Sequence, residues 1–302
     1  MGILNQTALA DIQFDLEMSF IDQLESADRV HEKIAMVDRT NQPLKRYKWI
    51  RNVPRMVKWV GERRIEKLTA DSHVIENEDW AIGIEVDRDD VRNDEFGSVE
   101  KRVRGLVDSA FDTFEEQVVN AYVNGFDASG GLSYDGQFLI DSDHTVNGDG
   151  TGTSQSNLIT PAFSKAGFEE AYQKMIGFID DKGKGLKVRP KYLLHGPSTW
   201  SNVRDVLLAD VINSGDTNLN RGLVTPIMTP HITDNKWFLI GEAGGMSPVI
   251  LQIRQDPEFR APVTSLEDFQ AFRTKTFYYG VDATFGVAPA AWQLVVGSNA
   301  TT

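Results

Sequence analysis

Residues 98–124 constrain the fold most, because they predict one long helix with a single apolar stripe. Large apolar side chains recur there every three or four residues, the spacing that gathers them on one helix face; they are Val99, Val103, Leu106, Ala110, Phe114, Val118 and Tyr122. At 1.5 Å per residue the helix would be roughly 40 Å long. We expect Ser98 to cap its start and Gly125 to end it. Such a helix predicts a spine on which other elements pack.

A second amphipathic helix is predicted near the start of the chain, over residues 5–27. Its apolar positions follow the same spacing; they are Leu9, Ile12, Leu16, Phe20 and Leu24. The segment carries five acids and no base. We interpret it as an acidic arm that packs on a larger body.

The next feature is the cationic segment, residues 45–68, KRYKWIRNVPRMVKWVGERRIEKL, which holds nine Lys or Arg side chains and two Glu. Residues 71–100 reverse this balance, with eleven acids and two bases. Within them, Trp80, Ile82, Ile84 and Val86 alternate with other residues, the period of a strand with one buried face. We predict a long β-hairpin or extended loop with one basic and one acidic arm. It has few large aliphatic residues, so we expect it to pack against another surface.

The rest of the chain mixes helices and short strands without a regular βαβ order. Residues 141–157 are rich in Gly, Ser, Thr, Asn and Asp and predict a loop. Further segments predict helices at 163–181 and 197–213, strands at 191–196, 236–242 and 249–254, and a β-rich tail at 269–297. This mixture predicts an α+β fold.

Composition narrows the class of protein. The chain has 302 residues, no cysteine and a formal net charge of −13. It therefore has no disulfide or thiolate metal site, and we expect a soluble protein of a reducing cytoplasm. No run approaches the ~18 apolar residues of a membrane span, so no membrane partner is expected. The acidic balance argues against general affinity for nucleic acid.

No motif predicts catalysis, a cofactor or a metal. The loop around Asn147 and Asp149 fails the calcium-loop pattern, because Thr145 and Ser156 stand where acids are needed. Ser198 and His195 lie close in sequence, but Trp200 replaces a glycine that a hydrolase elbow requires. The five histidines are scattered and form no ligand pair. An enzyme is therefore not predicted.

The cationic segment predicts a partner, since nine positive charges and two tryptophans share a stretch that is too poor in aliphatics to fold alone. Nucleic acid could bind it through arginine and aromatic stacking. An acidic protein surface could bind the same residues by charge-assisted pairing and Trp or Arg anchors. The segment has a net charge of +7, which leaves −20 on the rest of the chain. This distribution favours self-assembly.

Several stretches resemble the major capsid proteins of tailed phages, specifically the Mu-like major head subunit family. The resemblance lies in five blocks, which follow the family's order: KIAMV (33–37), WVGERRIEKL (59–68), VIENEDWAIGIEVDRDDVRND (74–94), YDGQFLIDSDH (134–144) and GLKVRPKYLLHGP (185–197).

The resemblance implies the Hong Kong 97-type capsid fold and a division of the chain. Residues 1–37 would be the N-arm and 38–97 the extended loop. The peripheral domain would comprise 98–154 and 263–302, with the spine helix at 98–124. The axial domain would span 155–262.

By the same resemblance, the chain would form hexamers and pentamers of an icosahedral phage head that encloses double-stranded DNA without binding it specifically. It would be assembled in the host cytoplasm, with separate scaffold, protease and portal proteins. The predicted contacts between subunits are the following residues of the cationic segment: Arg46, Trp49, Arg51, Trp59, Arg63 and Arg64. Two alternatives stay open, an encapsulin-type cellular compartment and a nucleic-acid-binding module that uses residues 45–68.

Overall fold

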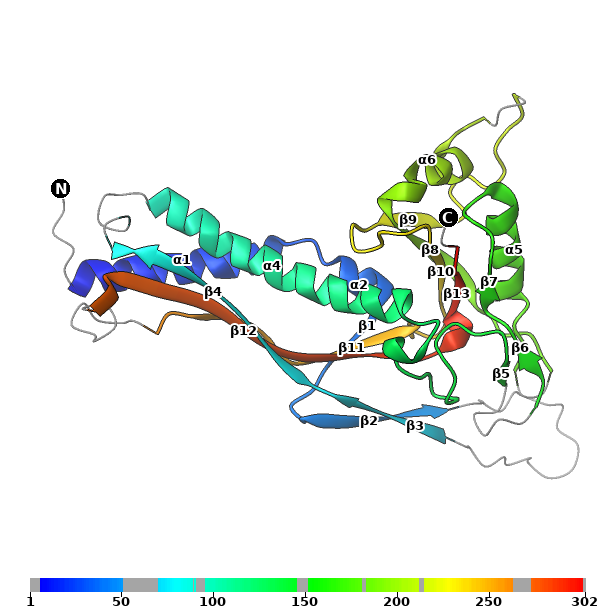
Figure 1. Cartoon of the computed structure of the whole chain (residues 1–302), viewed down its shortest axis with the longest axis horizontal. Coiled ribbons are helices and arrows are strands. Elements are labelled where there is room, and N and C mark those ends of the chain that lie inside the picture. The colour runs from blue at the N-terminus through cyan, green and yellow to red at the C-terminus, as the bar shows by residue number, and fades with distance from the viewer. Residues whose placement is uncertain are drawn as a thin grey trace, which may run out of the picture.

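The structure is a computed structural model, and it describes residues 6–50, 70–88, 90, 96–145, 152–180, 183–211, 215–262 and 273–300. Figure 1 shows an elongated body, in which the long helices α1 and α4 lie beside long strands. A second unit of shorter elements lies at one end of this body.

The spine predicted from the apolar stripe is helix α4 (Phe96–Val123). All seven stripe residues are buried, from Val99 to Tyr122. The helix begins two residues earlier than predicted, so Ser98 lies in its first turn and is not the N-cap. It ends at Val123, just before Gly125, where the backbone N–H of Gly125 donates to the carbonyl of Tyr122 at 3.1 Å. The predicted helix is confirmed, and its predicted capping residue is wrong.

The N-terminal arm consists of α1 (Gln6–Ser26) and the short α2 (Val30–Ile34). Helix α1 lies alongside α4 (Figure 1) and buries Leu9, Leu16 and Phe20. Polar contacts join the same two helices, since Nε2 of Gln23 donates to Asp108 at 2.7 Å. The amphipathic helix predicted over 5–27 is confirmed.

A four-stranded sheet runs beneath the spine in the order β1-β11-β12-β4. Its strands are β1 (Met36–Arg39), β11 (Val249–Arg260), β12 (Thr276–Pro289) and β4 (Glu78–Asp87). Phe114 of α4 meets Phe285 of β12 edge to face, with ring centroids 4.5 Å apart. Aromatic and aliphatic packing between one helix and one sheet therefore forms the main core.

The acidic half of the predicted hairpin has a different partner from the one expected. The hairpin consists of β2 (Leu44–Ile50) and β3 (Ala70–Glu76). After Asn77 the chain enters β4, which pairs along its whole length with β12. The physical reason is apolar contact, because Trp80 stacks on Phe285 at 5.1 Å and Val86 is fully buried. The prediction of one basic and one acidic arm is thus wrong beyond Glu76.

The second unit is a five-stranded sheet in the order β7-β13-β10-β8-β9. Its strands are β7 (Leu158–Ile159), β13 (Val295–Ser298), β10 (Trp237–Glu242), β8 (Arg189–His195) and β9 (Thr225–Met228). Helix α5 (Lys165–Ile176) packs on it through Phe168, Ala171 and Met175. The single helix predicted over 197–213 is wrong: the chain forms three short helical pieces, the 3₁₀ helix η2 (Pro197–Thr199), α6 (Trp200–Val203) and the π-helix η3 (Arg204–Leu208), and turns to an extended backbone at Ala209.

The remaining short elements connect the two sheets. They are η1 (Ala128–Gly130), β5 (His144–Thr145), β6 (Ser154–Gln155) and η4 (Trp292–Leu294). The predicted domain boundaries stay a prediction, and strand pairing crosses them in several places. Strand β11 falls in the predicted axial segment yet pairs with β12, and β13 falls in the predicted peripheral segment yet pairs with β10.

Candidate intersubunit surface

The β2–β3 hairpin carries the start of the cationic segment. Arg46 is exposed on β2 and stands opposite Val74 of β3, which is also exposed. Trp49 pairs in register with Asp71. The other predicted contact residues lie outside the described residues; they are Arg51, Trp59, Arg63 and Arg64. The structure therefore places two of the six predicted residues on one strand.

A polar cluster around Asp38 anchors the hairpin to the body. Lys45 forms an ion pair with the Asp38 carboxylate, and the Tyr47 hydroxyl donates to the same carboxylate at 2.6 Å. The Tyr47 oxygen also lies 3.0 Å from Oε1 of Gln252 on the central strand β11. Alternate residues of β2 thus point into the body, while Arg46 between them points outward.

The same cluster shifts two pKa values. Burial alone would raise the pKa of Asp38, but the hydrogen bonds from Lys45 and Tyr47 outweigh it and hold that pKa below its usual value. Burial, followed by the bond to Asp38, raises the pKa of Tyr47. The cluster therefore keeps a charged carboxylate and a neutral phenol at neutral pH.

The hairpin turns away from the long sheet at one residue, Asn77, which alone separates β3 from β4. Its amide Nδ2 donates to the carbonyls of Gln42 and Pro43, both at 3.1 Å, and its Oδ1 accepts from Gln252 at 2.8 Å. The crossing is close, because a Cβ on Gly286 would lie 2.3 Å from the carbonyl oxygen of Glu76. Only glycine fits there.

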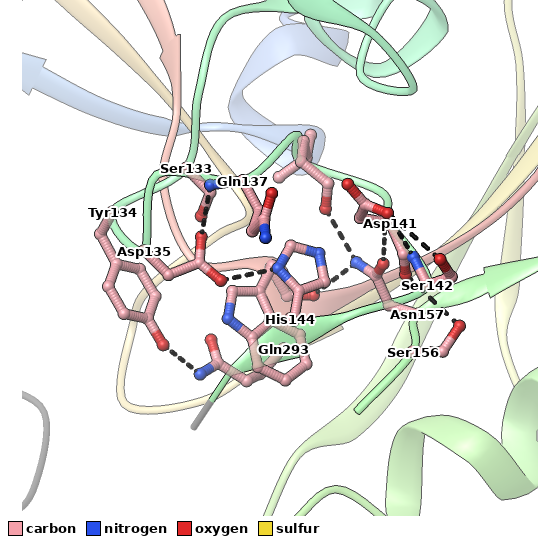
Figure 2. A network of polar contacts seen from close by, with 12 residues as sticks. Ser133, Tyr134, Asp135, Gln137, Asp141, Ser142, His144, Ser156, Asn157 and Gln293 are labelled. Carbon is pink, nitrogen blue, oxygen red and sulfur yellow. Dashed lines mark hydrogen bonds and ion pairs between the residues drawn. The ribbon is translucent and has the colours of Figure 1, made fainter. Parts of the chain in front are cut away.

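A second polar network joins the body to the five-stranded sheet (Figure 2). Nδ1 of His144 lies 2.7 Å from Oδ2 of Asp135, and both side chains are fully buried. The imidazole stacks on Trp292 with ring centroids 4.3 Å apart. Figure 2 also shows the Tyr134 hydroxyl bonded to the Gln293 amide. The block YDGQFLIDSDH thus folds around the C-terminal turn η4.

Asn157 completes this joint with three hydrogen bonds. Its Nδ2 donates to the carbonyls of Leu139 and Trp292, at 2.8 and 3.1 Å, and its Oδ1 accepts from the Asp141 N–H at 2.8 Å. Within the part of the chain that the structure describes, Nε2 of His144 has no hydrogen-bond partner. The Asp135–His144 pair therefore has the base and its orienting acid but lacks the hydroxyl or thiol of a nucleophilic triad. We interpret it as a structural joint.

A second buried histidine, His31, links α2 to the spine helix α4. His31 of α2 lies between Phe111, stacked at 5.6 Å, and Phe114, edge-on at 5.5 Å. Burial lowers the pKa of His31 to about 4, and the nearby positive charges of Arg29 and Arg39 add to this, although Glu32 acts in the opposite direction. A neutral imidazole thus fills the corner where α2 meets α4.

Across the described ranges, no three His, Asp or Glu side chains gather in a way that could hold a metal ion. In the same ranges, no helix is long and apolar enough to cross a membrane.

The comparison with protein families decides the class of protein. The model of the Mu-like prophage major head subunit gpT matches residues 9–168, 160–232 and 231–302, nearly the whole chain. This chain belongs to that family. It is thus a major capsid protein, the structural subunit of a phage head, and the family match favours neither the cellular compartment nor the nucleic-acid-binding module.

Curated relatives carry the same description. The Mu-like prophage FluMu major head subunit of Haemophilus influenzae is 23% identical over 276 residues, which cover 91% of this chain and 68% of that protein. The major capsid protein of Escherichia phage Mu is 31% identical over 140 residues, which cover 45% of each. The chain thus spans about two thirds of the first relative and less than half of the second.

Solved structures share the capsid fold. The procapsid of bacteriophage JBD30 matches 99% of this chain and 76% of its own, with a TM-score of 0.62 and 21% identity. The capsid of cyanophage P-SCSP1u matches with a TM-score of 0.58 and 10% identity, over 92% of this chain and 90% of its own. The virus-like particle from Pyrococcus furiosus matches with a TM-score of 0.53 and 12% identity, over 94% and 98%. The predicted Hong Kong 97-type fold is confirmed.

Proposed function

We propose that this head subunit assembles into hexamers and pentamers of an icosahedral shell that encloses double-stranded DNA, and that the cationic segment holds neighbouring copies together. The observation that carries the proposal is the separation of charge. A hairpin anchored at Asp38 and Asn77 carries a segment of net charge +7, while the rest of the chain carries −20. Contacts between copies would pair the positive segment with part of this negative surface.

The predicted contact residues would have two roles. The arginines Arg46, Arg51, Arg63 and Arg64 would pair with carboxylates of the next copy, and Trp49 and Trp59 would fill apolar seams. Each contact would be modest, and the strength of the shell would come from symmetric repetition. The rest of the chain is acidic, which suits a shell that contains DNA, since the inner wall of the shell should not bind the genome.

The other parts of the proposal follow from the family. Assembly would take place in the host cytoplasm, with scaffold, protease and portal as separate proteins. Residues 1–37, 38–97, 98–154 with 263–302, and 155–262 would act as N-arm, extended loop, peripheral domain and axial domain.

Reversal of charge at Arg63 and Arg64 tests the role of the cationic segment. We expect Arg63→Glu/Arg64→Glu to leave the subunit folded by circular dichroism but to stop particle formation in negative-stain electron microscopy. The matched control is Lys101→Glu/Arg102→Glu, an adjacent exposed basic pair near the start of α4, where acids suit the helix dipole. The proposal would be contradicted if Arg63→Glu/Arg64→Glu formed normal shells, or if both variants lost particle formation equally.

A further inference from the structure

Helix α1 has two apolar faces, and within the described part of the chain only one of them is buried. Leu9, Leu16 and Phe20 are buried against the body. On the outer face of α1, Phe14, Met18 and Ile21 are 62%, 43% and 38% exposed. Their spacing of four and three residues places them in one stripe. Single exposed apolar residues are ordinary, but an aligned stripe of three large ones indicates a docking surface.

The helix that carries this stripe is firmly held. Ser19 donates to Glu100 at 3.0 Å and accepts from Nε of Arg104 at 2.8 Å, and Gln23 binds Asp108. The outer face of α1 is thus presented by a fixed element, so a partner would meet a preformed surface.

Carboxylates surround the outer face of α1. The helix carries no base and five exposed acids, which flank the stripe along its length: Asp11, Asp15, Glu17, Asp22 and Glu25. Within the described part of the chain, none of the five forms an ion pair. Anionic lipid and nucleic acid would be repelled by this rim, whereas a cationic segment with interspersed apolar residues would match it.

The cationic segment of this chain has that chemistry. Its nine bases alternate with Trp, Ile, Val, Met and Leu. We propose that the outer face of α1 receives the cationic segment of a second copy, with the apolar stripe covered by its aromatic and aliphatic side chains and the acidic rim paired with its bases. This proposal rests on the proposed function and names the acidic surface that the neighbouring copy would offer.

The geometry of one chain favours a second copy as the source. In Figure 1 the hairpin runs from its base, where Leu44 pairs with Glu76, to its far end, where Ile50 pairs with Ala70. That far end points toward the five-stranded sheet, while α1 lies at the opposite end of the molecule. A contact between two different patches is heterologous, and heterologous contacts form a ring when the rotation between copies closes. The described part of the hairpin thus leads away from α1 of its own chain, which suits a contact between copies in a ring-shaped capsomer.

Disulfide trapping tests the contact directly, because the chain contains no cysteine. Shells would be assembled under reducing conditions from a mixture of Met18→Cys and Trp59→Cys subunits and then oxidised. Only a contact between copies can join these two variants. We expect non-reducing gels to show a shift from monomer to covalent dimer in mixed shells and little dimer in shells of either variant alone. The matched control pairs Trp59→Cys with Glu116→Cys, an exposed position on α4. Its subunits should run as monomers on the non-reducing gel.

The outcomes separate this inference from the proposed function. Shells with the Met18–Trp59 link support both. Shells that form without the link, or that link equally in the control, overturn the inference and leave the proposed function intact. If unsubstituted subunits form no shells under any assembly condition, the proposed function fails and the inference fails with it.

Exchange of charges between α1 and the cationic segment is an independent test of the contact. Asp15 and Asp22 lie on one side of the stripe, seven residues apart. We expect Asp15→Lys/Asp22→Lys to stop shell formation, as Arg63→Glu/Arg64→Glu does, and the combination of all four substitutions to restore shells. Restored shells would require that the outer face of α1 meets the cationic segment. If the four substitutions act separately, the chain would stay unassembled, and that result would count against the contact.

Discussion

Nδ1 of His144 lies 2.7 Å from Oδ2 of Asp135, and neither side chain reaches solvent. A buried hydrogen bond of this kind contributes mainly through the cost of leaving one partner alone. Together with the stack on Trp292, it connects the loop after the spine to the C-terminal turn.

Loss of the Asp135 carboxylate should weaken the whole subunit. Asp135→Ala leaves the His144 N–H without its acceptor, so we expect the free energy of unfolding to fall by about 1–3 kcal/mol. Urea denaturation followed by circular dichroism measures this change. Asp143→Ala, at an exposed position nearby, is the control and should stay within about 0.5 kcal/mol of the parent. An unchanged midpoint for Asp135→Ala would show that the pair is dispensable.

Acidification should destabilise the subunit through His31. The pKa of His31 is about 4 in the folded protein and about 6.5 when unfolded. As the pH falls below 6.5, the unfolded state takes up the proton first, so stability declines until the pH reaches about 4 and then levels off. At pH 4.5 the expected loss is about 2.5 kcal/mol relative to pH 7.5. His31→Leu should lack this pH-dependent loss of unfolding free energy. Both proteins contain the same carboxylates, so the difference between their pH profiles gives the contribution of His31 alone. Parallel pH profiles would refute the assignment.

Two phenylalanines should respond differently to truncation. Phe114 is 1% exposed and touches His31, Phe111 and Phe285, so Phe114→Ala should cost about 3–5 kcal/mol. Phe14 is 62% exposed on α1, and Phe14→Ala should change stability by less than about 0.5 kcal/mol. Equilibrium unfolding in urea compares the two. Equal effects would mean that the core does not lie where α4 meets β12.

Removal of the Tyr47 hydroxyl should loosen the hairpin and leave the body intact. Tyr47→Phe deletes the bonds to Asp38 and Gln252. We expect faster amide hydrogen exchange in residues 44–50 and 70–76, with unchanged exchange in α4. Tyr172→Phe, on α5 in the second unit, is the control and should leave the hairpin unaffected. Uniformly unchanged exchange after Tyr47→Phe would remove the anchoring role from the Asp38 cluster.

Local periodicity predicts α1 and α4 well, because their apolar stripes repeat within a few residues of sequence. It could not predict that Glu78–Asp87 pairs with β12, since strand alternation identifies a strand and not its partner. The same holds for buried polar sites. His31 meets Phe111, and His144 meets Trp292, across separations that leave no local signal. The block YDGQFLIDSDH contained both Asp135 and His144, but their pairing follows only from the fold.

The surface predicted for contacts between copies stays a prediction. The clustering of bases is visible in the sequence, and the structure places Arg46 outward on an exposed strand. The sequence pattern predicts one apolar stripe on α1, whereas the structure shows a second, exposed one. Phe14, Met18 and Ile21 form a second stripe with the same period, which only burial distinguishes from the first.

The single residue between β3 and β4 has a consequence for shell curvature. On one side of Asn77 the chain belongs to a sheet braced by the spine, and on the other side to a hairpin that leaves it. The base of the hairpin is fixed, because Asn77 binds Gln42, Pro43 and Gln252 and the buried Ile75 packs in one cluster with Ile250. The direction in which the hairpin leaves the body is therefore set within each subunit, so differences in tilt between neighbouring copies would arise beyond residues 44–76 at the hairpin base or in the contacts themselves.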